Sequence, residues 1–119
     1  ERDSPQVELQ LHSEFATIDE GIFEVIITVT VTAKQAGKDR VMFLIEAKQA
    51  GIFQIRNIPQ EDFEPVLAVT CPNILYPYLR EVVTDVSVRA GFAPVMLNPV
   101  NFESLYQQQK AQQANQPKH

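Results

Sequence analysis

The chain has 119 residues, of which 45% are hydrophobic and 21% charged, a composition typical of one folded globular domain. Its formal net charge of -5 repels phosphate backbones on average, so we do not expect nucleic acid as a partner. One cysteine excludes an internal disulfide, and no stretch is long and apolar enough to cross a bilayer, so we expect a cytoplasmic protein without direct membrane insertion. The first residue is Glu1 instead of methionine, and we therefore expect a processed, truncated or partly disordered N-terminus.

The first half of the chain alternates between apolar and polar residues with the period of two that is typical of strands. We predict strands at residues 6–15, 23–34, 40–48 and 52–57. Turns are expected at residues 18–21, around Gly37 and at Gly51, because glycine adopts the backbone angles that tight turns require. The pattern predicts an antiparallel meander of four strands with one apolar face, which requires a helical layer to cover it.

The alternation also predicts which side chains face that layer. In the second strand the inward residues are Phe23, Val25, Ile27, Val29, Val31 and Ala33. In the third strand they are Val41, Phe43, Ile45 and Ala47. Leu44 falls on the outward face, where a large apolar side chain is out of place.

A long amphipathic helix follows. A first helical segment begins near Asp62, with Phe63, Val66 and Leu67 predicted to be buried, and residues 71–73 are expected to break or kink it. After Pro77, apolar residues recur at helical spacing, and the predicted buried stripe is Leu79, Val82, Val83, Val86 and Ala90. Gly91 is a natural residue to end this helix.

Residues 91–99 contain two prolines and no helical period, which indicates an ordered crossover loop. Asn101 is predicted to cap a second, short helix with Phe102, Leu105 and Tyr106 on one side. The glutamine-rich tail at residues 107–119 lacks apolar anchors, and we expect it to be frayed or disordered. Residues 1–106 are therefore predicted to form the single domain.

No pattern of residues points to catalysis, a metal site or a cofactor. His12 alternates with apolar residues on a strand and has no partner at a motif spacing, so it is interpreted as a solvated strand residue. Cys71 stands alone, without the second cysteine that a redox or zinc site needs, and is interpreted as a small packing residue. The four glycines are isolated, which excludes a glycine-rich phosphate loop. We expect a protein that is not an enzyme.

Apolar residues remain after the predicted core is assigned. Ile22, Met42 and Leu44 lie on the polar side of the sheet, and Tyr78, Phe92, Val95, Met96 and Tyr106 gather around the crossover loop. Exposed apolar patches usually mark an interface or a binding groove. The alternative is that the residues near the loop complete a small core, and the sequence pattern does not favour either interpretation.

Three separated segments carry a resemblance to a known family. They are CPNILYPYLRE at residues 71–81, the PVNF run at residues 99–102 and AKQAGIF at residues 47–53. In combination they resemble SecB, the bacterial export chaperone, over essentially all of residues 5–106. The family usually carries a further N-terminal segment with acidic residues.

The resemblance implies an α+β protomer in which a four-stranded antiparallel sheet packs against a long helix. It implies a homotetramer, built as a dimer of dimers, with the helices between two outer sheets. It further implies an ATP-independent chaperone, without a cofactor, that holds unfolded precursor proteins in the cytoplasm. The chaperone would keep these precursors competent for translocation and deliver them to SecA, the motor ATPase of the Sec translocase. SecA's own C-terminal tail carries zinc and docks on the outer sheet face.

The resemblance also assigns roles to residues. Leu44 and Glu46 match positions that contact SecA on the outer sheet face. The opposite face of the same strand matches positions associated with tetramer assembly, namely Phe43, Ile45, Ala47 and Gln49. The apolar groove that accepts extended clients is matched by Leu9, Leu11, Phe92, Phe102 and Tyr106. An alternative function, compatible with the same groove, is a SecB-like chaperone dedicated to one partner, such as the antitoxin of a toxin-antitoxin system.

Overall fold

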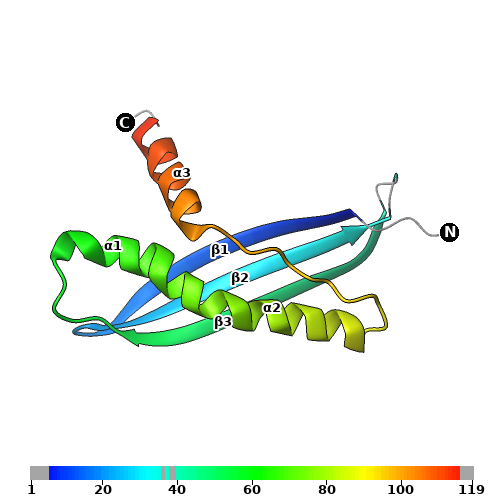
Figure 1. Ribbon diagram of the computed structural model, residues 1–119, viewed down its shortest axis with the longest axis horizontal. Coiled ribbons are helices and arrows are strands. Elements are labelled where there is room, and N and C mark those ends of the chain that lie inside the picture. The colour runs from blue at the N-terminus through cyan, green and yellow to red at the C-terminus, as the bar shows by residue number, and fades with distance from the viewer. Residues whose placement is uncertain (1–5, 36, 38–39, 116–119) are drawn as a thin grey trace.

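The fold is that of a computed structural model, which describes residues 6–35, 37 and 40–115. Three strands form one antiparallel sheet in the order β1 (Gln6–Asp19), β2 (Ile22–Lys34) and β3 (Val41–Gln54). The helices lie on one face of the sheet, and α2 runs along it (Figure 1). Within the described ranges no helix covers the other face, so the α+β layering expected from the one-sided alternation is confirmed.

The prediction of four strands was wrong. Gly51 does not turn the chain, because it lies inside β3 and pairs with Val25 of β2. Of the predicted fourth strand at residues 52–57, residues 52–54 are the end of β3, where Phe53 pairs with Phe23, and residues 55–57 are not in a strand. A glycine is needed here for space: a Cβ at residue 51 would lie 2.7 Å from Leu75 Cδ2 and 2.9 Å from Phe53 Cε1. A glycine in a turn and a glycine beneath a closely packed helix give the same local sequence pattern, so the pattern alone did not distinguish them.

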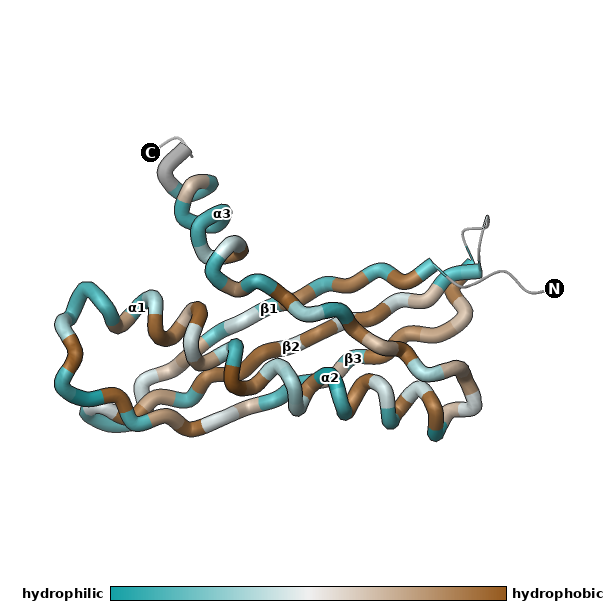
Figure 2. The backbone as a smooth tube through the Cα atoms, viewed as in Figure 1, coloured by the Kyte–Doolittle hydropathy of each residue, from teal (hydrophilic) through white to brown (hydrophobic). Residues whose placement is uncertain are grey.

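β2 is the centre of the core. Its inward residues Val25, Ile27, Val29, Val31 and Ala33 are all fully buried, as the alternation predicted. The hydrophobic colouring follows β2 along most of its length beneath the helical layer (Figure 2). A central strand with neighbours on both sides and a helix above loses almost all of its apolar surface to packing, which is the main stabilising term of the fold.

The helical layer is continuous from Gln60 to Arg89, but it is not uniform. It begins with η1 (Gln60–Asp62) and α1 (Phe63–Pro65), widens into a π-helical turn, η2 (Val66–Thr70), and continues as α2 (Cys71–Arg89). In the π turn the Cys71 N–H donates to the Val66 carbonyl, five residues back. Proline at residue 72 has no N–H to donate, so we attribute the local widening to it. The break expected at residues 71–73 does not occur: these residues begin α2, and the irregular turn lies just before them, at Val66–Thr70.

Gly91 ends α2 as predicted. Its φ is +92°, and the Phe92 N–H donates to the Ser87 carbonyl at 3.0 Å while the Gly91 N–H donates to the Val88 carbonyl at 3.0 Å. This pair of hydrogen bonds is the Schellman arrangement, which satisfies the last free carbonyls of a helix.

The predicted buried stripe of α2 was only partly right. Leu79 and Val83 are fully buried, whereas Val82 and Val86 are 39% and 40% exposed. The stripe that faces inward is instead Cys71, Leu75, Tyr76, Leu79, Val83 and Ser87. Ser87 was not predicted to be buried, because serine is a polar residue. Val82 and Val86 were predicted to face inward because of their hydrophobicity alone.

After α2 the chain crosses back over the helical side of the sheet and enters α3 (Phe102–Asn115). The predicted cap is confirmed, because the Ser104 N–H donates to Asn101 Oδ1 at 3.0 Å. Helix α3 extends to Asn115, so residues 107–115 are helical where we expected a frayed or disordered tail. Gln, Lys and Ala are good helix formers, and Gln107 Nε2 donates to Glu103 Oε2 at 3.0 Å one turn earlier. Residues 116–119 of that tail lie outside the described residues.

The close approach at Gly51 gives a stability prediction. Gly51→Ala forces its Cβ against Leu75 and Phe53, and we expect a loss of about 1–3 kcal/mol in the free energy of unfolding. Urea denaturation measures this loss. Ala50→Ser, one residue away on the exposed face, is the matched control and is expected to change stability by less than about 0.5 kcal/mol. In a Leu75→Ala background the Gly51→Ala penalty should shrink, and an unchanged penalty would refute the steric explanation.

Candidate functional site

An apolar groove lies between β1, η2 and α3. It has a volume of about 180 Å³, and its apolar and aromatic lining is Leu11, Phe15, Leu67, Ala68, Phe102, Leu105 and Tyr106. β1 lies at an edge of the sheet, and no described strand pairs along its outer side. The groove therefore combines apolar contacts with free main-chain hydrogen-bonding groups, which is the combination that binds extended peptide segments by strand addition.

A hydrogen bond and an ion pair to Glu64 hold α3 at the end of this groove. Tyr106 Oη donates a hydrogen bond to Glu64 Oε1 at 2.8 Å, and Lys110 Nζ lies 4.0 Å from the same oxygen. The Lys110 ammonium also lies 5.4 Å from the centre of the Tyr106 ring. The hydrogen bond to the Glu64 carboxylate, together with burial, raises the pKa of Tyr106, so the phenol keeps its proton and remains a donor.

The structure brings together three of the five residues predicted for the groove, namely Leu11, Phe102 and Tyr106. Leu9 lies one step along the same face of β1 and is 40% exposed. Phe92 is elsewhere: it packs on Phe43 of β3, with ring centres 4.3 Å apart. Phe92 therefore does not line this groove in the protomer, and the assignment of the five residues to client binding stays a prediction.

Four apolar residues of the groove were not among the predicted ones, namely Phe15, Leu67, Ala68 and Leu105. Phe15 is 52% exposed at the groove, and Leu105 lines its α3 wall. Leu105 was predicted on one side of the second helix and Leu67 as a buried residue of the first helical segment. They were not assigned to a groove, because the sequence does not show that the helical layer leaves β1 only partly covered.

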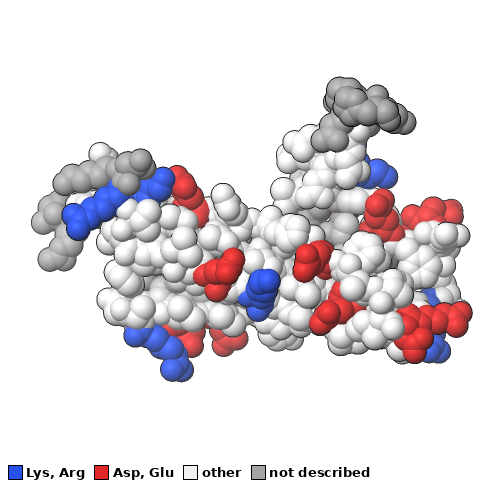
Figure 3. All heavy atoms as spheres, turned by 180° about the vertical axis from the view of Figure 1, so that it is seen from behind, with Lys and Arg blue, Asp and Glu red and all other residues white. Residues whose placement is uncertain are grey.

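The second surface is the outer face of the sheet. Leu44 is 60% exposed and Ile52 is 61% exposed, and Glu46 lies between them on the same side of β3. Leu44 pairs with Thr32 and Glu46 with Thr30, so both stand beside short polar side chains. Acidic residues outnumber basic ones over the middle of the face seen in Figure 3 and at the end where β1 turns into β2. The outward position of Leu44 is confirmed.

The residues predicted for tetramer assembly lie on the inner face of β3. Ile45 and Ala47 are 7% and 9% exposed and belong to the core of the protomer beneath the helical layer. Phe43 and Gln49 are half-buried on the same face. Any effect of Ile45 or Ala47 on assembly therefore acts through the helix that covers them.

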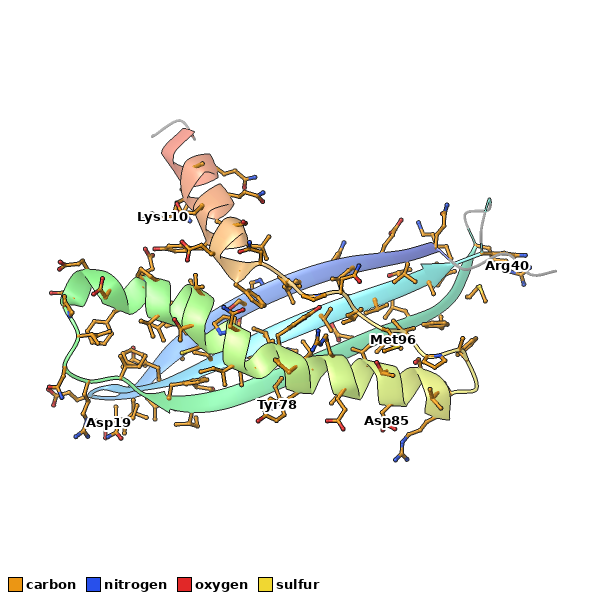
Figure 4. The ribbon with its side chains drawn as sticks, in the orientation of Figure 1. Asp19, Arg40, Tyr78, Asp85, Met96 and Lys110 are labelled. Atoms are coloured by element: carbon orange, nitrogen blue, oxygen red, sulfur yellow. The ribbon has the colours of Figure 1, made fainter. Side chains whose placement is uncertain are left out.

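That helix carries a third surface, which we call the outer stripe of α2. It consists of Ile74, Tyr78, Val82 and Val86, which are spaced by one helical turn and are 51%, 59%, 39% and 40% exposed. Beside it, α2 and the crossover loop line a broad groove of about 910 Å³ that includes Met96, which is 78% exposed. Figure 4 labels Tyr78 on α2 and Met96 on the loop. A row of apolar side chains on an exposed helix indicates a protein interface.

The described residues contain no group of three or more His, Cys, Asp or Glu side chains that could hold a metal ion. Cys71 is buried, and burial raises the pKa of its thiol, which keeps it in the unreactive protonated form. No helix in the described part of the chain is long and apolar enough to span a membrane. The candidate functional features of this structure are the groove, the outer sheet face and the outer stripe of α2.

Comparison with known proteins identifies the family of this chain. A model of the family described as preprotein translocase subunit SecB matches residues 1–113. The protein-export protein SecB of Methylobacillus flagellatus is 59% identical over 114 residues, which cover 96% of this chain and 71% of the relative. The SecB of Chromobacterium violaceum is also 59% identical, over 96% of this chain and 75% of the relative.

A solved structure supports the fold. The SecB-like chaperone of Mycobacterium tuberculosis, in complex with a ChAD peptide from the HigA1 antitoxin, superposes with a TM-score of 0.71. The match covers 81% of this chain and 72% of that chain, and at 20% identity it shows a shared fold alone. Together with the match of the family to residues 1–113, the sequence relatives show that this chain belongs to the SecB family of protein-export proteins.

Proposed function

We propose that this protein is an ATP-independent chaperone that holds unfolded precursor proteins in the cytoplasm and passes them to SecA. The observation that carries the proposal is the apolar groove beside the open edge of β1, in a chain of the SecB family. Main-chain pairing is independent of client sequence, and shallow apolar contacts discriminate weakly between side chains. Such a groove suits many different unfolded clients.

We further propose that the outer sheet face docks SecA and that the outer stripe of α2 joins protomers in a homotetramer. The first assignment is supported by Leu44, an exposed apolar residue beside the acidic Glu46, which together suit a basic partner segment with an apolar contact. The second is supported by the four exposed apolar side chains of the outer stripe, which a second copy of α2 would cover. The two surfaces belong to different elements, β3 and α2, and share no residue.

Two variants, Phe15→Ser in the groove and Leu44→Ser on the outer sheet face, are predicted to differ in their affinity for an unfolded client. Phe15→Ser removes an apolar side chain from the groove, and we expect the affinity for an unfolded secretory precursor to fall about tenfold. Leu44→Ser is the matched control, because it makes a similar change at a similarly exposed site on the outer face. Suppression of precursor aggregation without nucleotide, at stoichiometric ratio, measures the effect. If the two variants lose holding equally, the groove assignment is wrong.

Glu46→Lys tests the outer face. The reversal of charge places a cation where a basic SecA segment is proposed to dock, so we expect binding to SecA to weaken about tenfold or more at low salt. Holding of the unfolded precursor should be unchanged. Surface plasmon resonance with immobilised SecA measures the first effect, and the aggregation assay measures the second. Retained SecA binding would remove Glu46 from the proposed interface.

Tyr78→Glu tests assembly. A carboxylate in the middle of the outer stripe would be buried against apolar side chains of a second copy, and we expect the tetramer to dissociate into smaller species. Light scattering should give four times the 13.5 kDa protomer mass for the wild type and less for the variant. Tyr78 is 59% exposed in the protomer, so its replacement leaves the core packing intact. The dissociated variant should therefore still unfold cooperatively in urea. A variant that remains tetrameric would place the interface elsewhere.

A further inference from the structure

Two hydroxyl groups of α2 hold the middle of the crossover loop. Ser87 Oγ accepts a hydrogen bond from the Val95 N–H at 3.0 Å, and Thr84 Oγ1 donates one to the Val95 carbonyl at 2.6 Å. Both main-chain groups of Val95 are thus satisfied by side chains of the helix, as a neighbouring strand would satisfy them. We call Thr84, Ser87 and the Val95 main chain the crossover clamp.

The clamp is built into the interior of the protein. Ser87 is fully buried, and Val95 is 9% exposed. The Ser87 hydroxyl uses its own proton to donate to the Thr84 carbonyl at 2.8 Å, which leaves its oxygen free to accept from Val95. The described residues contain no buried side-chain polar atom without a partner. Because a buried N–H without a partner is costly, removal of the Ser87 hydroxyl would leave the Val95 amide unsatisfied unless the loop moved toward water.

The loop leads from the clamp to the groove. Three residues after Val95, the carbonyl of Asn98 accepts a hydrogen bond from Tyr76 Oη at 2.7 Å. Tyr76 in turn packs edge-on against Phe102, with ring centres 5.7 Å apart. Phe102 is the first residue of α3 and lines the groove. The crossover clamp, the Tyr76 contacts and the first turn of α3 therefore form one connected path from α2 to the groove wall.

We propose that Thr84 and Ser87 are positioning residues for client binding, which fix the crossover loop so that the α3 wall of the groove is formed before a client arrives. This inference rests on the proposed holding function. Neither side chain lines the groove of β1, η2 and α3, so the effect is transmitted through the loop. A wall that is ordered in advance lowers the conformational entropy lost on binding and so strengthens a loose, apolar contact.

The experiment combines amide hydrogen exchange with client affinity in the full chain. For Ser87→Ala and, separately, Thr84→Val, we expect exchange of the Val95 and Met96 amides to accelerate about tenfold, while β2 amides keep their protection. The dissociation constant for a fluorescently labelled, urea-unfolded secretory precursor should rise about three- to tenfold. Thr84→Ser keeps the hydroxyl and should restore both values. Ser104→Ala removes an exposed hydroxyl of α3 that is outside the clamp and is the matched control.

Each outcome decides the matter. Faster loop exchange with weaker client binding, reversed in Thr84→Ser, supports the proposal. Faster loop exchange with unchanged client affinity overturns it, and so does unchanged exchange at Val95. If Ser87→Ala does not fold, the part-buried Thr84 pair of variants carries the same test. Failure of the proposed holding function is a separate result, because the wild-type protein would then bind no precursor in the same titration.

Discussion

The packing of α2 on the sheet is the constraint on which the rest of the structure depends. β2 and β3 present a continuous apolar face, and one helix covers it along almost its whole length. The fit is close at Gly51, where the leucine side chain of residue 75 occupies the space that a Cβ would need. Because α2 lies over β2 and β3, β1 is left with an incomplete cover, and the groove is the space that remains beside it.

Much of the sheet follows from the sequence. The strict alternation of β2 predicted every one of its fully buried residues, and it identified Leu44 as an outward apolar residue. The alternation is reliable here because one face is buried and the other is not, so a shift by a single residue would reverse every side chain. The strand count failed at Gly51, since local pattern does not distinguish a turn from a close approach between elements that lie far apart in the chain.

The helix was harder to predict for a geometric reason. The inward residues Leu75, Leu79, Val83 and Ser87 are four apart, and a step of four exceeds one turn of 3.6 residues. From Leu75 to Ser87 the stripe has therefore turned by about 120° around the helix axis. The first residues of the stripe face the sheet and the last faces the returning crossover loop, which is why a serine is buried there and valines beside it are exposed. The groove was only partly predictable for a related reason: its walls come from three segments whose contact is set by this loop.

The alternation of β3 has a consequence for how such a protein changes during evolution. Even-numbered positions from Met42 to Ile52 form the outer surface, and odd-numbered ones belong to the core side. Substitutions at even positions can therefore alter partner recognition while the interior is preserved, and the two sets of positions are free to drift independently. An insertion or deletion of one residue within the strand would exchange the sets and expose the core. We therefore expect length variation among homologues to be confined to the turns, and diversity within β3 to follow every second residue.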